Sequence, residues 1–343
     1  MKIGIFVWAG VASLSFAAAA ASETGQPLAE GHRARGLAAA RVFPGYASLC
    51  DLEAPMRNVN LPRVSRPARD GTARETRPSR LIEQLAPSDF PPVQVFDNLW
   101  FLGTPSVTAW LYGTAEGYLL IDGLNTDEEA QHYILDGMAA LGLDPAGIKA
   151  VLVTHGHGDH YGGADYLADR LGIDVLMSRA DWALVSALGD HPRFGAPPQA
   201  GGVVEDGDIL DIGASKLAIH LTPGHTPGTV SPILELQDGS QRHVAMLWGG
   251  TGFNFGPDVR IFRQYAASAR KMEEIARAAG VDVFLSNHPR RDATLEKLDA
   301  LADRQAGEGH PFVSGEEGYA LFTLLKECAL AQAARFAGAD GGG

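Results

Sequence analysis

The sequence predicts an α/β protein in which β-sheets lie in the middle and helices lie outside. Strand-like and helix-like segments alternate along residues 93–343, which is the pattern of sheets covered by helices. With 41 Gly, 20 Pro and 8% aromatic residues, the composition is typical of a chain with many turns. A length of 343 residues is enough for a large domain with a sizeable hydrophobic core.

Short apolar runs bounded by turn formers indicate the strands, and apolar residues spaced three and four apart indicate the helices. We expect strands at residues 93–97, 99–102, 108–112, 118–122, 150–154, 174–178, 216–221, 230–236, 243–248 and 281–286. We expect helices at residues 127–141, 163–171, 179–188, 266–279 and 316–336. Four closely spaced strands therefore open the domain, and strands and helices alternate after them.

The first residues have the order of an export signal. Lys2 precedes an apolar stretch over residues 3–16, and small residues up to Ala21 lead into a polar segment. An N-terminal membrane anchor is the alternative, but the stretch is short for a membrane span and lacks a flanking charge after it. We therefore expect a signal peptide over residues 1–21, no membrane anchor, and a periplasmic or secreted mature protein.

Charge is divided unevenly along the chain. Residues 22–92 hold ten Arg, no Lys, eight acidic residues and nine of the prolines, whereas residues 93–343 hold 17 basic and 33 acidic residues. Proline keeps its neighbours extended and opposes helix formation, so we expect an irregular N-terminal extension, as at residues 63–69 and 74–78. This basic extension either docks on the acidic main domain or forms a solvated linker. A net charge of −13 argues against a nucleic-acid partner.

Two cysteines exclude a disulfide-dense scaffold and a zinc site of four Cys ligands. Any metal ion must therefore be held mainly by His and carboxylate side chains. Cys50 lies in the N-terminal extension and Cys328 lies in the expected C-terminal helix. An oxidising compartment permits a disulfide between them, and two unpaired thiols are the alternative, because the sequence does not give their separation.

The densest chemical signal is the run THGHGDHYGG at residues 154–163, directly after an apolar strand. Three imidazoles and one carboxylate within six residues, separated by Gly, form a turn whose side chains can converge on one point. His155 and His157, two residues apart, can share one side of an extended segment and bind one ion. Asp159 and His160, further round the turn, would then face a second ion.

Two further histidines have the same setting, each at the end of an apolar strand and flanked by turn formers. His225 lies in PGHTPG and His288 lies in SNHP. Six side chains make two sites of three ligands, which leave positions open for water or substrate, as catalytic zinc sites do. Five imidazoles favour zinc over an ion that prefers oxygen, and iron and manganese stay open as alternatives. The other histidines are expected to be packed or solvated, with His191, in a loop of Pro and Gly, the main exception.

The run HGHGDH at residues 155–160, followed by GHTPG around His225 and then by His288, resembles the metallo-β-lactamase superfamily over residues 93 to about 310. The resemblance implies an α/β fold of the αββα sandwich type, with a dinuclear site at one sheet edge, preceded here by an irregular Pro/Arg-rich N-terminal arm. It also implies a first zinc site of His155, His157 and His225 and a second zinc site of Asp159, His160 and His288.

Residues after the strand at 243–248 distinguish branches of that superfamily. Glyoxalase II and lactonase branches carry a bridging Asp there, and β-lactamase subclasses B1 and B2 carry a Cys. This chain has neither, so the ligand set resembles subclass B3, as does the C-terminal helix. Subclass B3 enzymes usually have serines in this loop that help to bind the β-lactam carboxylate, and this chain has Gly250, Thr251 and Gly252 instead.

The resemblance and the ligand chemistry imply an exported hydrolase with two zinc ions that opens the amide of a β-lactam ring. Bound zinc lowers the pKa of water to about 7, and Asp159 would be the catalytic residue that orients the resulting hydroxide. The missing serines motivate the alternative of a B3-like hydrolase for another ester, lactone or phosphodiester. The Arg-rich arm motivates a third hypothesis, a metal-binding or partner-binding protein with vestigial catalysis. The oligomeric state is left open.

Residues that neighbour the expected ligands in sequence are candidates for the wall of a substrate pocket, with core packing as the alternative for the aromatic ones. They are Trp110, Tyr161, Thr251, Phe253, Asn254, Ser286 and Asn287.

Overall fold

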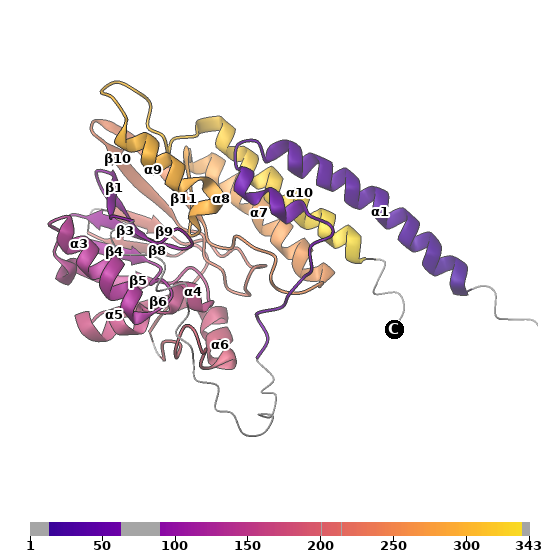
Figure 1. Ribbon diagram of the computed structural model, residues 1–343, viewed down its shortest axis with the longest axis horizontal. Coiled ribbons are helices and arrows are strands. Elements are labelled where there is room, and N and C mark those ends of the chain that lie inside the picture. Colours follow the sequence, from indigo (N-terminus) through magenta and orange to yellow (C-terminus); the bar gives the residue numbers. More distant parts are fainter. Residues whose placement is uncertain (1–13, 63–89, 200, 214, 338–343) are drawn as a thin grey trace, which may run out of the picture.

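Two β-sheets face each other between two layers of helices (Figure 1). The computed structural model describes residues 14–62, 90–199, 201–213 and 215–337, with side chains from residue 26 onward. The first sheet contains, in spatial order, β1 (Val93–Phe96), β2 (Leu99–Gly103), β3 (Thr108–Thr114), β4 (Gly117–Ile121), β5 (Ile148–Leu152), β6 (Asp174–Ser178) and β7 (Gly202–Val204). The second contains β12 (Val283–Ser286), β11 (Gln241–Trp248), β10 (Ile233–Asp238), β9 (Ser215–Ala218) and β8 (Ile209–Ile212).

Both sheets change from antiparallel to parallel pairing. The pairs from β1 to β4 are antiparallel, and the pairs from β4 to β7 are parallel. In the second sheet only the pair of β11 and β12 is parallel. A parallel pair needs a crossover connection, usually a helix, and these crossovers place helices on the outer faces. Parallel pairing also places the carboxyl end of β4 beside that of β5, and the carboxyl end of β11 beside that of β12.

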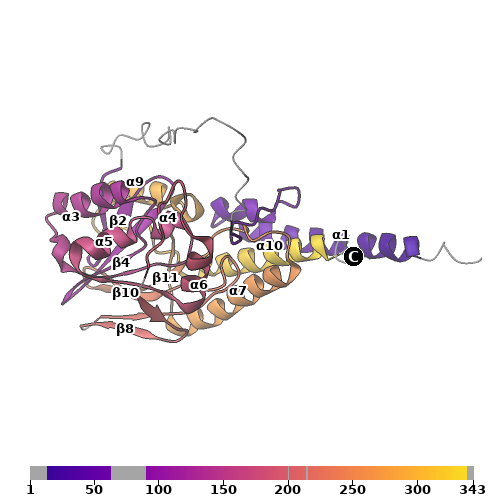
Figure 2. The same cartoon turned by 90° about the horizontal axis from the view of Figure 1, so that it is seen from below.

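Helices cover the two outer faces, as the second view also shows (Figure 2). The chain between β4 and β7 forms α2 (Asp127–Glu129), the π-helix η3 (Ala130–Leu135), α3 (Asp136–Ala140), η4 (Pro145–Gly147), α4 (Gly158–Tyr161), α5 (Ala164–Leu171) and α6 (Arg179–Leu188). After β11 come α7 (Val259–Ala279), α8 (Pro289–Asp292), α9 (Thr294–Ala302), η5 (Gly315–Tyr319) and α10 (Ala320–Phe336). No helix among the described residues is long and apolar enough to cross a membrane.

Both faces of the first sheet are buried, and successive side chains of one strand serve different cores. On β3, Trp110 and Tyr112 point into the core between the sheets, whereas Ala109 and Leu111 point into the core under the helices. Such strands read as continuous apolar runs rather than as alternating patterns, which is why their positions could be predicted. The predicted αββα sandwich is confirmed.

Several elements differ from the prediction. The sequence does not predict β7 and β8, which are short edge strands, or α8 and α9. Helix α7 begins seven residues earlier than expected, because the carboxylate of Asp258 accepts hydrogen bonds from the backbone of Arg260 and Ile261 at 2.8 and 3.4 Å. It ends at Gly280, whose φ of 71° closes the helix in the left-handed conformation.

The N-terminal extension is helical over part of its length, contrary to the expectation that Pro makes it irregular. Helix α1 (Leu14–Ala39) contains Pro27 and lies along α10, and η1 (Pro44–Cys50) follows it (Figure 1). Glu327 of α10 accepts hydrogen bonds from His32 and Arg35 of α1 at 2.7 and 2.8 Å. Packing against α10 therefore outweighs the loss of one backbone donor at Pro27. Residues 1–13 of the expected signal peptide and the stretch 63–89 lie outside the described residues.

A disulfide joins Cys50 to Cys328 across a sequence separation of 278 residues. Helix α1 lies close against this disulfide, because a Cβ atom at Gly36 of α1 would lie 2.5 and 2.8 Å from the two sulfur atoms. Phe43, Tyr46 and Leu49 join the same core as α7 and α10. The first part of the extension is therefore a component of the main domain rather than a linker.

We expect the double substitution Cys50→Ser and Cys328→Ser to lower the free energy of unfolding by about 2–4 kcal/mol, because the disulfide closes a long loop in the unfolded chain. Urea denaturation of chelator-treated protein measures this without a contribution from bound metal. Wild-type protein under reducing conditions should match the double variant. Equal stability of oxidised wild type and double variant would contradict the prediction.

Candidate metal centre

Three loops bring the candidate ligands to one edge of the sandwich. Residues 155–160 follow the carboxyl end of β5, His225 lies between β9 and β10, and His288 follows β12. The two sheets are linked at this edge, because the amide of Thr108 donates a hydrogen bond of 2.9 Å to the carbonyl of Asn287. Side chains that are far apart in the sequence therefore meet where the parallel strands of both sheets end.

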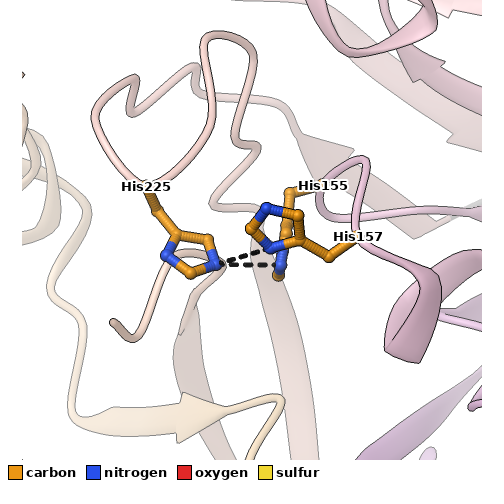
Figure 3. A group of neighbouring side chains, drawn as sticks. All are labelled: His155, His157 and His225. Atoms are coloured by element: carbon orange, nitrogen blue, oxygen red, sulfur yellow. Dashed lines mark hydrogen bonds between the residues drawn. The ribbon is translucent and has the colours of Figure 1, made fainter. Parts of the chain in front are cut away.

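Three imidazoles converge in the first cluster, which consists of His155, His157 and His225 (Figure 3). The Nε2 atom of His225 lies 3.0 Å from Nε2 of His155 and 3.1 Å from Nδ1 of His157. Ligand nitrogens of a tetrahedral zinc ion with bonds of 2.0–2.1 Å lie about 3.3 Å apart. The spacing therefore fits three ligands of one ion.

Hydrogen bonds on the far side of two rings determine which nitrogen faces the cluster. Nδ1 of His225 donates to the carbonyl of Gly252 at 2.7 Å, which leaves the lone pair on Nε2. Nε2 of His157 donates to the side-chain oxygen of Asn60 at 2.7 Å, which leaves the lone pair on Nδ1. Both lone pairs then point toward the centre of the cluster.

Asp159, His160 and His288 form a second, more open cluster beside the first. Oδ2 of Asp159 lies 3.6 Å from Nε2 of His160 and 3.8 Å from Nε2 of His288. Nδ1 of His288 donates to the carbonyl of Ser106 at 2.7 Å, so its Nε2 is free to accept. Nε2 of His160 is buried without a hydrogen-bond partner among the described residues, which is costly unless a metal ion is bound there. The donors therefore fit a second ion.

Burial keeps the first cluster neutral. It lowers the pKa of His155 and His225 well below the usual value and that of His157 to about 4, and the neighbouring imidazoles contribute in the same direction. Burial alone would raise the pKa of Asp159, but the charges of His160 and His288 outweigh it and lower that pKa. At neutral pH the first cluster therefore presents neutral imidazoles beside the carboxylate of Asp159, the protonation states that metal binding needs. For His160, burial lowers the pKa, but the carboxylates of Asp159 and Asp122 outweigh it and raise that pKa.

Asp122 is a functional residue that the sequence analysis missed. It lies directly after β4 with φ of 67°, and its carboxylate is fully buried. It accepts hydrogen bonds from the amide of Thr154 at 2.7 Å, the hydroxyl of Thr154 at 2.9 Å and Nδ1 of His160 at 2.7 Å. This carboxylate orients a second-cluster imidazole. Its signal in the sequence is an Asp that ends an apolar strand and precedes Gly123.

Asp181 is the second missed carboxylate, and it connects two ligand loops. It accepts hydrogen bonds from the amides of Gly156 and Gly228, both at 2.8 Å, and from the hydroxyl of Thr226 at 2.6 Å. Burial raises its pKa to about 6, against the effect of these hydrogen bonds. Nothing in the sequence indicates this role, because an Asp in the first turn of α6 looks like an ordinary helix-start residue.

A cavity of about 860 Å³ opens over the two clusters. Three of the candidate pocket residues, Tyr161, Thr251 and Asn254, line it, and so does His191. The cavity is also lined by residues of the N-terminal extension, among them Val59 and Leu61, which the sequence analysis did not assign to the site.

Four candidate pocket residues do not line this cavity, contrary to the prediction. Trp110 is buried between the sheets, and its Nε1 donates to the carbonyl of Ser286 at 2.9 Å. Phe253 packs against the rings of α7. The amide of Asn287 donates to the hydroxyl of Thr154 and to the carbonyl of Gly249, both at 3.0 Å. These residues pack beneath the ligand loops and do not face the cavity. Proximity to the ligands in sequence cannot distinguish this supporting role from a position in the cavity wall.

Comparisons with known proteins agree with this geometry. A family model described as the metallo-beta-lactamase superfamily matches residues 102–239. The sandwich superimposes on BJP-1, a subclass B3 metallo-β-lactamase of Bradyrhizobium japonicum, with a TM-score of 0.56 and 27% identity over 69% of this chain and 91% of that chain. Residues 102–239 thus match the metallo-β-lactamase superfamily. Native FEZ-1 metallo-β-lactamase from Legionella gormanii has the same fold, with a TM-score of 0.61 and 23% identity over 69% of this chain and 92% of that chain.

Curated relatives match this chain over shorter stretches. A hydroxyacylglutathione hydrolase of Anaeromyxobacter dehalogenans is 35% identical over 120 residues, which are 34% of this chain and 41% of that protein. A hydroxyacylglutathione hydrolase of Francisella philomiragia is 28% identical over 155 residues, or 44% of this chain and 52% of that protein. The chain thus spans about half the length of these relatives, so they support a metallo-hydrolase and do not decide the substrate.

We expect Asp122→Asn to weaken zinc binding at the second cluster by about 10–100-fold, because the amide no longer holds Nδ1 of His160 as a carboxylate does. Zinc titration against a chromophoric chelator measures this. Asp282→Asn is a matched control, because Asp282 accepts from Nδ1 of His243 at 2.6 Å and from the amide of Val244 at 2.9 Å, away from the metal centre. Unchanged zinc affinity in Asp122→Asn would contradict the prediction.

Without metal, the free energy of unfolding should rise with pH between about 4 and 6.5 and then level off. The folded pKa of His157 is about 4 and its ordinary value is 6.5, so the unfolded chain binds more protons in this range. Three other site imidazoles shift in the same direction, whereas Asp181 and His160, whose pKa values are raised, oppose them. Urea denaturation of chelator-treated protein at several pH values measures the slope, and a slope of zero or the opposite sign would contradict this account.

Proposed function

We propose that the protein is an exported dinuclear zinc hydrolase of subclass B3 type that opens the amide of β-lactam rings. The observation that carries the proposal is the convergence of two three-residue clusters, all His and Asp, on one open cavity. Among the described residues, no thiolate and no second carboxylate belongs to either cluster. Metal ions at such sites supply a hydroxide nucleophile at neutral pH and polarise the substrate carbonyl.

The residues of the chain have separable roles in this reaction. His155, His157 and His225 would hold one ion, and Asp159, His160 and His288 would hold the other. Asp159 is partly exposed to the cavity, and its lowered pKa keeps it a hydrogen-bond acceptor at neutral pH. It is therefore placed to orient an attacking water by accepting a hydrogen bond from it.

Recognition of a substrate carboxylate needs a donor other than the serines of subclass B3. Arg290 and Arg291 follow His288 and line the cavity. The guanidinium of Arg291 is bound to the carbonyl of Gly45 and the hydroxyl of Ser48. Arg290 is exposed and lines the cavity, and it would supply the cation for a β-lactam carboxylate. This residue supports an anionic substrate.

The alternative substrate is the ester of a thiol, another ester, a lactone or a phosphodiester. Two observations favour it: relatives are named hydroxyacylglutathione hydrolases, and Gly250, Thr251 and Gly252 stand where serines are usual in subclass B3. The same two-ion chemistry would serve this reaction, so only substrate preference separates the two candidates.

Export is part of the proposal. The order of residues 1–21 is that of a signal peptide, and the disulfide between Cys50 and Cys328 is of the kind that persists in oxidising compartments. We therefore propose a periplasmic or secreted location. Cell fractionation with an antibody, and the mass of the mature N-terminus, test this point directly.

Purified protein with zinc should hydrolyse a carbapenem and a cephalosporin, lose that activity with chelator and regain it with zinc. Elemental analysis should give two zinc ions per chain. Turnover of an acyl-glutathione thioester with negligible turnover of both β-lactams would reject the first candidate and support the alternative.

Asp159→Asn should lower kcat by about 10²–10³-fold on the preferred substrate, because the neutral amide orients the water less strongly and does not balance the charge of the second ion. Asp190→Asn is the matched control, since Asp190 lines the same cavity and belongs to neither cluster. Steady-state kinetics of the two variants, with circular dichroism to check folding, measure the difference. Retained activity in Asp159→Asn would contradict the dinuclear scheme.

A further inference from the structure

A short segment of the N-terminal extension crosses the metal centre. The carbonyl of Arg57 accepts a hydrogen bond from the amide of Gly256 at 2.8 Å, and the amide of Val59 donates to the carbonyl of Asn254 at 2.8 Å. Asn58 pairs with Phe255 between these contacts as an antiparallel bridge. The segment thus pairs in a strand-like way with the loop after β11. That loop forms part of the cavity wall.

Asn60, at the end of this segment, contacts two residues of the first cluster with one amide group. Its Oδ1 accepts from Nε2 of His157 at 2.7 Å, and its Nδ2 donates to the carbonyl of His225 at 2.8 Å. The two contacts join residues separated by 97 and 165 positions in the sequence. One side chain therefore ties the loop after β5 to the loop before β10 at the point where their imidazoles converge.

We propose that Asn60 is a positioning residue of the metal centre, through which the N-terminal extension completes the first zinc site. This inference rests on the proposed function, because it assigns Asn60 a role toward the zinc ion of that site. Accepting from Nε2 fixes the ring orientation of His157 and keeps the lone pair on Nδ1, where the first cluster needs it. Donating to the carbonyl of His225 also holds the loop before β10 in place, so that the imidazole of His225 stays beside that of His157.

The extension is anchored firmly enough to place a side chain with this accuracy. The disulfide at Cys50 precedes the segment, and Gln332 of α10 donates to the carbonyl of Asp51 at 2.8 Å. Arg335, one helical turn further on α10, donates to the carbonyl of Ala54 at 3.0 Å. The chain is therefore held at several points between the disulfide and Asn60, including the backbone contacts of Arg57 and Val59 with the loop after β11.

A contact without influence on the metal is the competing explanation, and variants of Asn60 separate the two. Asn60→Leu removes both the acceptor and the donor at similar volume. Asn60→Asp keeps an acceptor for His157 and loses the donor to His225. Arg57→Ala is the matched control, because only the backbone of Arg57 takes part in the contact with Gly256. Urea denaturation checks that each variant is folded.

The test measures zinc affinity and the metal's surroundings rather than activity alone. We expect Asn60→Leu to weaken binding of one zinc ion by about 10–100-fold in competition with a chromophoric chelator and to change the visible absorption spectrum of the cobalt-substituted protein. Asn60→Asp should regain most of the affinity, and Arg57→Ala should match wild type.

Two results would overturn the inference: wild-type affinity and cobalt spectrum in Asn60→Leu, or an Asn60→Asp variant as weak as Asn60→Leu. Failure of the proposed function has a different signature, since wild-type protein would then fail to bind two zinc ions or to hydrolyse any substrate offered. If Asn60→Leu does not fold, Asn60→Asp compared with Arg57→Ala still decides, because a loss in Asn60→Asp of the full 10–100-fold would overturn the inference.

Discussion

The buried carboxylate of Asp122 is the contact on which the metal centre depends most. It lies where β4 ends and receives three hydrogen bonds from Thr154 and His160, so it joins the first sheet to the ligand loop after β5. A buried carboxylate is stable only when such donors surround it, and each donor is therefore held in one position. The pairing register between β4 and β5 therefore determines how the imidazole of His160, in the second cluster, is oriented.

The same reasoning extends outward from the clusters. Asp181 joins the loop after β5 to the loop before β10, and Asn60 joins those two loops again from the opposite side. The carbonyls of Ser106 and Gly252 accept hydrogen bonds from the Nδ1 atoms of His288 and His225. Each of these partners fixes a ring or a loop, and two of them, Ser106 and Gly252, also line the cavity. The ligand geometry is therefore a property of the packed loops and not of the HGHGDH run alone.

Burying several imidazoles together has an energetic cost that shapes the protein. Burial and the neighbouring imidazoles lower the pKa values of His155, His157 and His225, so protonation of these rings destabilises the metal-free protein. A bound cation would offset that cost by satisfying the inward-facing nitrogens, including Nε2 of His160. The extension adds to the surrounding structure, because η1 and the disulfide at Cys50 place Asn60 beside His157.

The sequence by itself determined the sandwich and the candidate ligands, because continuous apolar runs identify strands buried on both faces, and a dense run of His and Asp has few structural explanations. Tertiary structure alone decided the supporting partners: Asp122, Asp181 and Asn60 are ordinary polar residues until folding brings them against a ring or a loop. It also decided that Trp110 belongs to the core and that helix α1 forms despite Pro27. Patterns along a chain report burial and local conformation, whereas partnerships across about a hundred residues depend on how the elements pack, which local patterns do not contain.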